Sequence, residues 1–142
     1  MHFRGFVIVD QPTNEAVNAA MEPHREGYDS ETDTGYGEWD WFRVGGRYDG
    51  YLVSDGEMLR RETKGGFNFG PAHTDIARNS VKVSDLPKDR RSIYFFVVGK
   101  EWVAKESWDG ETFKDNEDFE GQLSEALKQH PDKYVVVVDA HS

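Results

Sequence analysis

The run YVVVVD at residues 134–139 decides the fold of this 142-residue chain. Its four consecutive valines leave no polar face, which is typical of a strand covered on both sides in the middle of a sheet. We therefore predict a sheet built around this segment, with its neighbours and its cover supplied by the rest of the chain.

A helix at residues 118–130 (DFEGQLSEALKQH) is predicted to cover one face of that sheet. Asp118 is placed to cap its N-terminus, and Pro131 ends it. Its apolar residues recur at helical spacing, so they form one face that needs a partner. These residues are Phe119, Leu123, Ala126 and Leu127.

A β-hairpin is predicted from SIYFFVV (92–98) and EWVAKESW (101–108), which flank the turn residues Gly99 and Lys100. The side chains of the second segment alternate between two sides, so we expect one continuous strand there. One side carries Trp102, Ala104, Glu106 and Trp108, and the other carries Val103, Lys105 and Ser107.

The first half of the chain predicts the order β-α-β-β. FRGFVIV (3–9) is an apolar run typical of a buried strand, and NEAVNAAMEPH (14–24) has the pattern of a helix capped by Thr13. WDWFRV (39–44) and YDGYLV (48–53) are predicted to be two short strands joined by a glycine pair.

Together these elements predict one α+β domain over residues 1–142, with a mixed or antiparallel sheet and two main helices. A ferredoxin-like arrangement is one candidate for it. The stretch 54–71 is rich in glycine and charge and is expected to be irregular, with a short helix at 72–79.

The composition excludes several kinds of chemistry. The chain has no cysteine, so disulfides, thiolate zinc sites and cysteine catalysis are excluded. It also lacks the GxSxG elbow of serine hydrolases and the HExxH helix of zinc proteases. An enzyme is therefore the less favoured interpretation.

The charge and the N-terminus limit the partners. A net charge of -10 disfavours general nucleic-acid binding, and it suits a basic protein partner. The short apolar run at the N-terminus matches neither a signal peptide nor a membrane span. We therefore expect a cytoplasmic protein without membrane association.

Aromatic, arginine and glycine residues are densest in GEWDWFRVGGRYDGYL, residues 37–52. If WDWFRV is a strand, its alternate residues Trp39, Trp41 and Arg43 share one face. The glycine pair removes side chains, so a ligand or another backbone segment can come close. Aromatic walls, arginines and exposed backbone N–H groups suit a planar or anionic small molecule. The predicted ligand-binding residues are Trp39, Trp41, Arg43, Gly45, Gly46, Arg47 and Tyr48.

The structural alternative is that this segment builds a corner of the core. In that case Arg47 pairs with Asp40 or Asp49, and the aromatic rings fill the interior. Neither GxGxxG nor GxxxxGK, the two phosphate-loop patterns, is present. The sequence leaves both interpretations open.

The string WDWFRVGGRYDGYL also resembles a motif of the form W-D-W/Y-x-x-I/V-G-G-R-W/Y-x-G, which occurs in small uncharacterised proteins of bacteriophages and their bacterial hosts. The terminal VVVVDAHS is similar to the apolar strand ending in D-x-H near the end of such proteins. The two stretches cover roughly a sixth of the chain, and Tyr48 stands where tryptophan is commoner. The resemblance implies a phage or mobile-element accessory protein, and it carries over no catalytic residue.

A metal site is a further interpretation. His141 follows Asp139 by two residues at the end of a predicted strand, and His73 and Asp75 form a similar pair in a loop. These four residues suit a divalent metal if the fold brings them together. Neither pair has the spacing of a known hydrolase, so we predict neither a resident metal nor a cofactor.

These observations favour binding over chemistry. We expect a non-enzymatic accessory protein that binds a host factor, with counter-defence as one setting. The first alternative is a protein that binds or sequesters a nucleotide-like small molecule through residues 37–52. The second is a metal-dependent hydrolase.

Overall fold

Strand β8 (Tyr134–His141), which contains the valine run, lies inside the main sheet as predicted. The computed structural model describes residues 1–25, 37–52, 75–108 and 110–142. All structural statements below concern these residues.

Around β8 the described residues form further strands, two α-helices and several short 3₁₀ turns. The strands are β1 (His2–Val9), β2 (Trp41–Val44), β3 (Ser80–Lys82), β4 (Phe95–Val98), β5 (Glu101–Ala104), β6 (Glu106–Trp108) and β7 (Phe113–Asp115). The helices are α1 (Asn14–Met21) and α3 (Phe119–Gln129). The 3₁₀ turns are η1 (Glu22–His24), η2 (Gly46–Tyr48), η3 (Ile76–Asn79) and η4 (Val83–Asp85).

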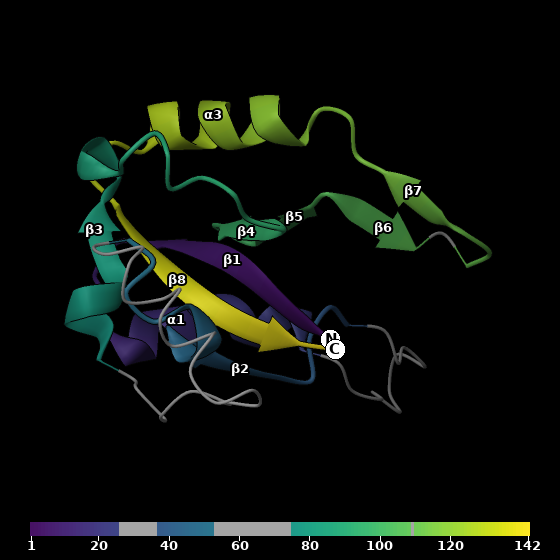
Figure 1. Ribbon diagram of the computed structural model, residues 1–142, viewed down its shortest axis with the longest axis horizontal. Helices are drawn as coiled ribbons and strands as arrows, with labels where there is room; N and C mark the ends of the chain where they lie inside the picture. The colour runs from purple at the N-terminus through teal and green to yellow at the C-terminus, as the bar shows by residue number, and fades with distance from the viewer. Residues whose placement is uncertain (26–36, 53–74, 109) are drawn as a thin grey trace.

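The main sheet is mixed, with the order β2-β8-β1-β4-β5 (Figure 1). Strand β1 runs antiparallel to β8 along its whole length, and β4 runs parallel to β1. Strand β5 is antiparallel to β4, while β2 and β3 lie one after the other along the outer edge of β8. The predicted α+β class, with a mixed sheet and two helices, is confirmed.

Alternate residues of the central strands face two separate hydrophobic cores. Phe6 of β1 and Val137 of β8 belong to the core beneath α3, whereas Val7 and Val136 belong to the core beside α1. The two helices therefore cover opposite faces of the sheet (Figure 1). The helices on opposite faces and the parallel pair β1–β4 do not by themselves define a ferredoxin-like fold. The ferredoxin-like arrangement therefore stays a prediction.

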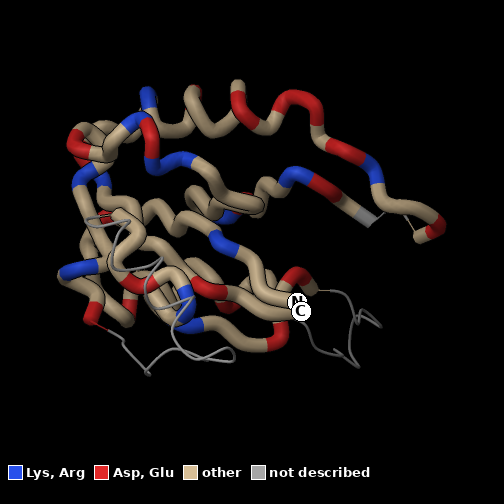
Figure 2. Tube along the Cα trace, viewed as in Figure 1, with Lys and Arg blue, Asp and Glu red and all other residues tan. Residues whose placement is uncertain are grey.

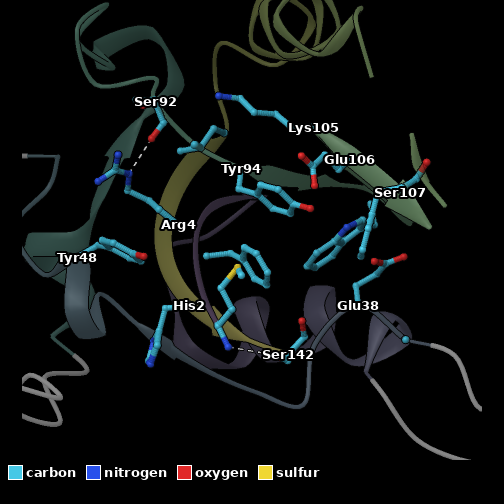
Figure 3. Close-up of a pocket in the computed structure, with 16 residues that line it drawn as sticks. His2, Arg4, Glu38, Tyr48, Ser92, Tyr94, Lys105, Glu106, Ser107 and Ser142 are labelled. Atoms are coloured by element: carbon cyan, nitrogen blue, oxygen red, sulfur yellow. Dashed lines mark hydrogen bonds between the residues drawn. The ribbon is translucent and has the colours of Figure 1, made fainter. Parts of the chain in front are cut away.

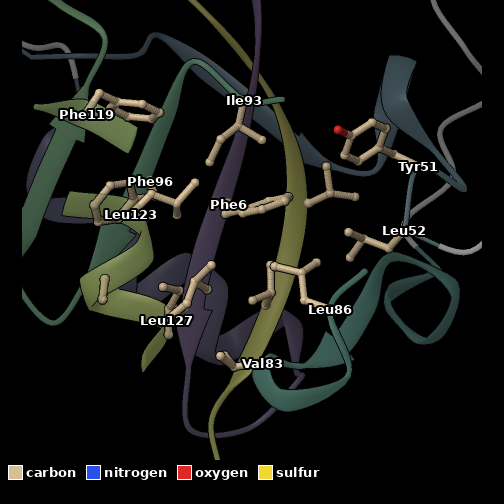
Figure 4. Close-up of a cluster of buried hydrophobic side chains, with 14 residues drawn as sticks. Phe6, Tyr51, Leu52, Val83, Leu86, Ile93, Phe96, Phe119, Leu123 and Leu127 are labelled. Atoms are coloured by element: carbon tan, nitrogen blue, oxygen red, sulfur yellow. The ribbon is translucent and has the colours of Figure 1, made fainter. Parts of the chain in front are cut away.

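The apolar face predicted for α3 is buried on the sheet. Leu123 is 1% exposed and belongs to the same core as Phe6 and Phe96 of the sheet (Figure 4). Phe119, Ala126 and Leu127 complete the face, and all are buried.

Helix α1 begins after Thr13 and ends before Pro23, the proline that the sequence predicts to limit it. The Oγ1 atom of Thr13 accepts a hydrogen bond from the backbone N–H of Ala16 at 3.1 Å, so Thr13 is the N-cap. The α-helix stops at Met21 because Pro23 falls in the 3₁₀ turn η1 that follows. Neither α1 nor α3, the α-helices of the described residues, is long and apolar enough to cross a membrane.

The predicted hairpin around Gly99 is formed by β4 and β5, but residues 101–108 are not one strand. Strand β5 ends at Ala104, and β6 pairs with β7 in a separate two-stranded sheet. At this break the side chain of Asn116 contacts the chain, and its Nδ2 donates a hydrogen bond to the carbonyl of Ala104 at 3.1 Å. The backbone N–H of Asn116 also donates to the carbonyl of Lys105 at 2.7 Å. These bonds hold the chain where it leaves the main sheet.

The strand predicted at 48–53 is not formed in residues 48–52, its described part. The chain coils instead, because Gly45 adopts a φ of +70° and accepts a hydrogen bond from the N–H of Tyr48 at 2.8 Å. A second turn follows, with the N–H of Tyr51 bonded to the carbonyl of Tyr48 at 3.0 Å.

The short helix predicted at 72–79 appears as the 3₁₀ turn η3 rather than as an α-helix. Asp75 caps it, with a carboxylate oxygen accepting from the N–H of Ala77 at 3.1 Å. Residues 72–74 and the stretch 54–71 lie outside the described residues.

The packing of α3 on the sheet predicts the effect of a core truncation. Leu123→Ala should lower the free energy of unfolding by about 2–5 kcal/mol, because the side chain is buried and its removal leaves a cavity. Ser124→Ala, on the exposed side of the same helix, should change it by less than about 0.5 kcal/mol. Urea denaturation of both variants is the measurement, and equal stabilities would contradict the packing described here.

Candidate functional site

The glycine pair of the predicted site forms a tight corner between β2 and η2. Gly45 and Gly46 have φ angles of +70° and +54°, which residues with a side chain rarely adopt. A Cβ atom on Gly45 would lie 2.6 Å from Nδ2 of Asn79, and one on Gly46 would lie 2.7 Å from Cβ of Asp139. Glycine is needed at both positions because other segments of the same chain pack against this backbone.

The buried carboxylate of Asp139 closes this corner. One oxygen accepts a hydrogen bond from the backbone N–H of Arg47 at 2.9 Å, and the other lies 2.7 Å from Nδ1 of His2. The N–H of Gly45 also donates internally, to the carbonyl of Val137 at 2.9 Å. The N–H groups of Gly45 and Arg47, which the ligand interpretation needs, are therefore bound within the protein.

A second buried polar group, Asn79, holds the other side of the corner. Its Nδ2 donates to a carboxylate oxygen of Asp49 and to the carbonyl of Asp75, both at 2.8 Å. Its Oδ1 accepts from the N–H of Gly50 at 3.0 Å. Asn79 and Asp49 are both fully buried, so these bonds offset the cost of removing the two side chains from water.

The two acids expected to pair with Arg47 have other partners. A carboxylate oxygen of Asp49 lies 3.3 Å from Nε of Arg78, and one of Asp40 lies 2.8 Å from Nδ1 of His141. Arg47 contributes its backbone N–H to the corner, where it binds Asp139.

Trp39, which was expected beside Trp41 on an open face, is buried in the core. It is 6% exposed, its Nε1 donates to the carbonyl of Met21 at 2.8 Å, and its ring packs edge-on against Phe42. Trp39 lies before the start of β2 and forms an isolated β-bridge with Arg25 instead of a strand pairing. The strand alternation therefore does not extend to this residue.

Trp41 and Arg43 do lie together at the surface. Trp41 is 36% exposed, its ring stacks on that of His141 at 5.2 Å, and the Arg43 guanidinium lies 5.7 Å from the indole. His2 packs edge-on against Trp41 at 5.1 Å. The structure thus brings Trp41 and Arg43 together and separates them from Trp39.

The residues of the metal interpretation are not assembled in the described part of the chain. Asp139 and His141 share one face of β8 but bind different partners. Asp75 caps η3, and His73 lies outside the described residues. Among the described residues, no group of three or more histidine, aspartate or glutamate side chains is placed to hold a metal ion.

A cleft of about 860 Å³ opens at the end of the sheet where β1 and β4 begin (Figure 3). It lies between the start of β1, the residues before β4 and the hairpin β6–β7. Of the seven residues predicted to bind a ligand, Tyr48 alone lines this cleft. The polar and aromatic residues around it include Arg4, Glu38, Tyr48, Ser92, Tyr94, Trp102, Lys105, Glu106, Ser107 and Phe113.

One end of the cleft is acidic. Glu38 and Glu106 both line it, and Figure 3 shows Glu106 beside Tyr94, with Glu38 farther along the cleft. Partial burial raises the pKa of Glu38. Burial also raises the pKa of Tyr94, and the negative charges of Glu106 and Glu38 raise it further. Negative charge is thus concentrated around the Tyr94 hydroxyl.

The other end carries Arg4, on the side of Tyr94 opposite Glu38 (Figure 3). The Nε–H of Arg4 donates to the carbonyl of Ser92 at 2.7 Å, and the guanidinium lies 4.1 Å from the ring centre of Tyr51. The cleft therefore has opposite charges at its two ends and aromatic walls between them, which suits binding.

Sequence analysis missed most of this cleft. Arg4, Tyr94 and Glu106 come from separate segments without a motif, and Glu38 lies in the stretch 37–52 but was not among its predicted ligand-binding residues. A partial signal was the alternation that placed Trp102 and Glu106 on one side of a predicted strand.

Comparison with known proteins found no family model, no curated protein and no solved structure that matches this chain. The function of the cleft has to be argued from its own geometry.

The glycine corner predicts opposite results for two neighbouring substitutions. Gly46→Ala should lower the free energy of unfolding by more than about 1–2 kcal/mol, because alanine is strained at this φ and its Cβ meets Asp139. Arg47→Ala keeps the N–H that binds Asp139 and should cost less than about 1 kcal/mol. Thermal unfolding of both variants is the check, and a larger loss for Arg47→Ala would contradict the corner.

The pair of Asp40 and His141 predicts a pH dependence. The hydrogen bond to His141 lowers the pKa of Asp40. The ionised Asp40 therefore stabilises the folded protein at pH values above the ordinary pKa of an aspartate, and this stabilisation is lost as the pH falls through the lowered pKa. His141→Phe keeps a ring beside Trp41 and should raise the pKa of Asp40 toward its ordinary value. Carbon NMR titration measures this. His130→Phe, which removes an imidazole elsewhere, should leave the titration unchanged; an unaltered Asp40 pKa in His141→Phe refutes the pairing.

Proposed function

We propose that this protein is a non-enzymatic binding protein and that a protein partner occupies the cleft at the end of the sheet. The resemblance of WDWFRVGGRYDGYL to phage accessory proteins makes a host-cell protein the expected partner, with counter-defence as the setting. The binding role itself rests on the cleft.

The observation that carries a protein partner is the exposed ring of Phe113 at the rim of the cleft. It is 67% exposed and lies on the hairpin β6–β7, which stands off the main sheet (Figure 1). Aromatic side chains are enriched among the residues that protein–protein interfaces bury, so this ring can serve as an anchor for a partner. A small molecule confined to the cleft would leave most of the hairpin uncovered.

The charge distribution favours a basic partner. The hairpin arm carries both signs of charge, with the acids Glu106, Glu111 and Asp115 beside Lys105 and Lys114 (Figure 2). The excess of acid in the chain as a whole is what favours a basic partner. With a net charge of -10, the chain attracts positively charged proteins and accelerates their association.

A nucleotide-like small molecule is the second candidate, favoured by one observation. The cleft volume of about 860 Å³ lies within the range of roughly 300–1,000 Å³ that is usual for ligand pockets. Such a ligand would bind beside Arg4 and Tyr48 rather than at the glycine corner. The metal-hydrolase alternative gains no support from the described residues.

Blocking the cleft tests the proposed function. Ser107→Trp fills it from strand β6, whereas Ser124→Trp places the same side chain on the exposed side of α3. Both variants are first checked for unchanged thermal unfolding. Each is then used with the wild-type protein to capture partners from a bacterial lysate, and captured proteins are purified for direct binding measurements.

We expect a stoichiometric partner that binds the wild type and Ser124→Trp and is lost with Ser107→Trp. A partner retained equally by all three proteins would exclude the cleft as its site. Tight binding of a nucleotide by the purified protein, lost with Ser107→Trp and without any protein partner, would favour the second candidate.

A further inference from the structure

We propose that the cleft accepts the side chain of an arginine from the partner protein, at the end lined by Glu38 and Glu106. The inference rests on the proposed function, because it names the chemistry of the group that the partner presents.

The acidic end is assembled from three separate segments. Glu38 precedes β2, Tyr94 precedes β4 and Glu106 lies on β6, yet all three line one cleft (Figure 3). Ionised carboxylates are hydrogen-bond acceptors only, so the two glutamates suit a group that carries several N–H donors. A guanidinium has five such donors.

The basic groups that line the cleft make contacts with other residues. Arg4 donates to the carbonyl of Ser92, and the N-terminal ammonium of Met1 donates to the carbonyl of Ser142 at 3.1 Å. The ammonium of Lys105 lies 3.8 Å from a carboxylate oxygen of Glu120 on α3, and Nδ1 of His2 lies 2.7 Å from Asp139. None of these contacts involves Glu38 or Glu106, so the two carboxylates suit a cation from another molecule.

The walls of the cleft favour a planar cation. Tyr94 stacks on Phe3 at 4.5 Å, and Trp102 stacks on Phe95 at 4.0 Å, so both rings are fixed in place. A guanidinium both stacks on aromatic rings and forms paired hydrogen bonds with a carboxylate. An ammonium is a compact, strongly hydrated charge and makes no such paired contact.

The electrostatics of the cleft agree with this chemistry. Partial burial raises the pKa of Glu38, and burial together with the charges of Glu106 and Glu38 raises the pKa of Tyr94. A bound cation would favour the ionised form of Glu38 and so lower its pKa.

The test uses a blocked arginine amide as the probe and the full chain as the receptor. Binding is followed by NMR through the ring signals of Tyr94 and the indole N–H of Trp102. We expect a saturable shift for arginine amide, a weaker one for lysine amide and none for the neutral analogue citrulline amide. Saturating arginine should also lower the pKa of Glu38, which a general effect of added salt would not do selectively.

A pair of charge-matched double variants locates the site. Glu38→Gln with Glu106→Gln should bind arginine amide at least about tenfold more weakly, because charged hydrogen bonds are lost. Glu15→Gln with Glu101→Gln removes the same charge from exposed positions outside the cleft and should bind like the wild type. Equal affinities of the two double variants, or equal binding of citrulline, would overturn the proposal. Lysine that binds as tightly as arginine would overturn the preference for a guanidinium.

The same variants separate this inference from the proposed function. A protein partner that Ser107→Trp excludes but the Glu38/Glu106 double variant retains would refute the arginine while leaving the cleft as the binding site. A partner that Ser107→Trp does not affect would refute the proposed function itself.

Discussion

The carboxylate of Asp139 is the group on which the whole end of the sheet depends. It lies on β8, 2% exposed, and its two oxygens contact His2 of β1 and the backbone N–H of Arg47. A carboxylate this deeply buried needs hydrogen-bond partners, so the start of β1 and the turn after β2 have to meet at this point. The turn can come close enough only because Gly46 has no side chain.

Two departures from regular strand structure then shape the surface. At the glycine corner the chain crosses the sheet edge, so that Val44 lies in the core beside α1 and Leu52 in the core beneath α3. At the other edge, Asn116 binds the carbonyl groups of Ala104 and Lys105, and the hairpin β6–β7 separates from the sheet. The first departure completes a core, and the second opens the cleft.

The predictable part of the structure was the part with local signals. A continuous valine run and the helical spacing of Leu123 and its neighbours depend on nearby residues alone, so the central strand and α3 were found. The break at Asn116 and the burial of Trp39 depend on contacts between distant segments, which periodicity does not report. The three-residue strands β3 and β7 are too short to show a period. For the same reason most of the cleft was missed: its charged residues meet only after folding.

The glycine corner and the cleft are physically connected, although the corner itself binds no ligand in our proposal. His2 contacts Asp139 and also lines the cleft, and the next two residues, Phe3 and Arg4, line it as well. Phe3 in turn stacks on Tyr94, whose ring lies beside Glu106 in the cleft. The hydrogen bond at Asp139 therefore fixes the start of β1, and the start of β1 fixes one wall of the binding site. Within residues 37–52, Glu38 and Tyr48 line the cleft directly. The glycine corner contributes indirectly, by holding the strand that forms one wall of the cleft.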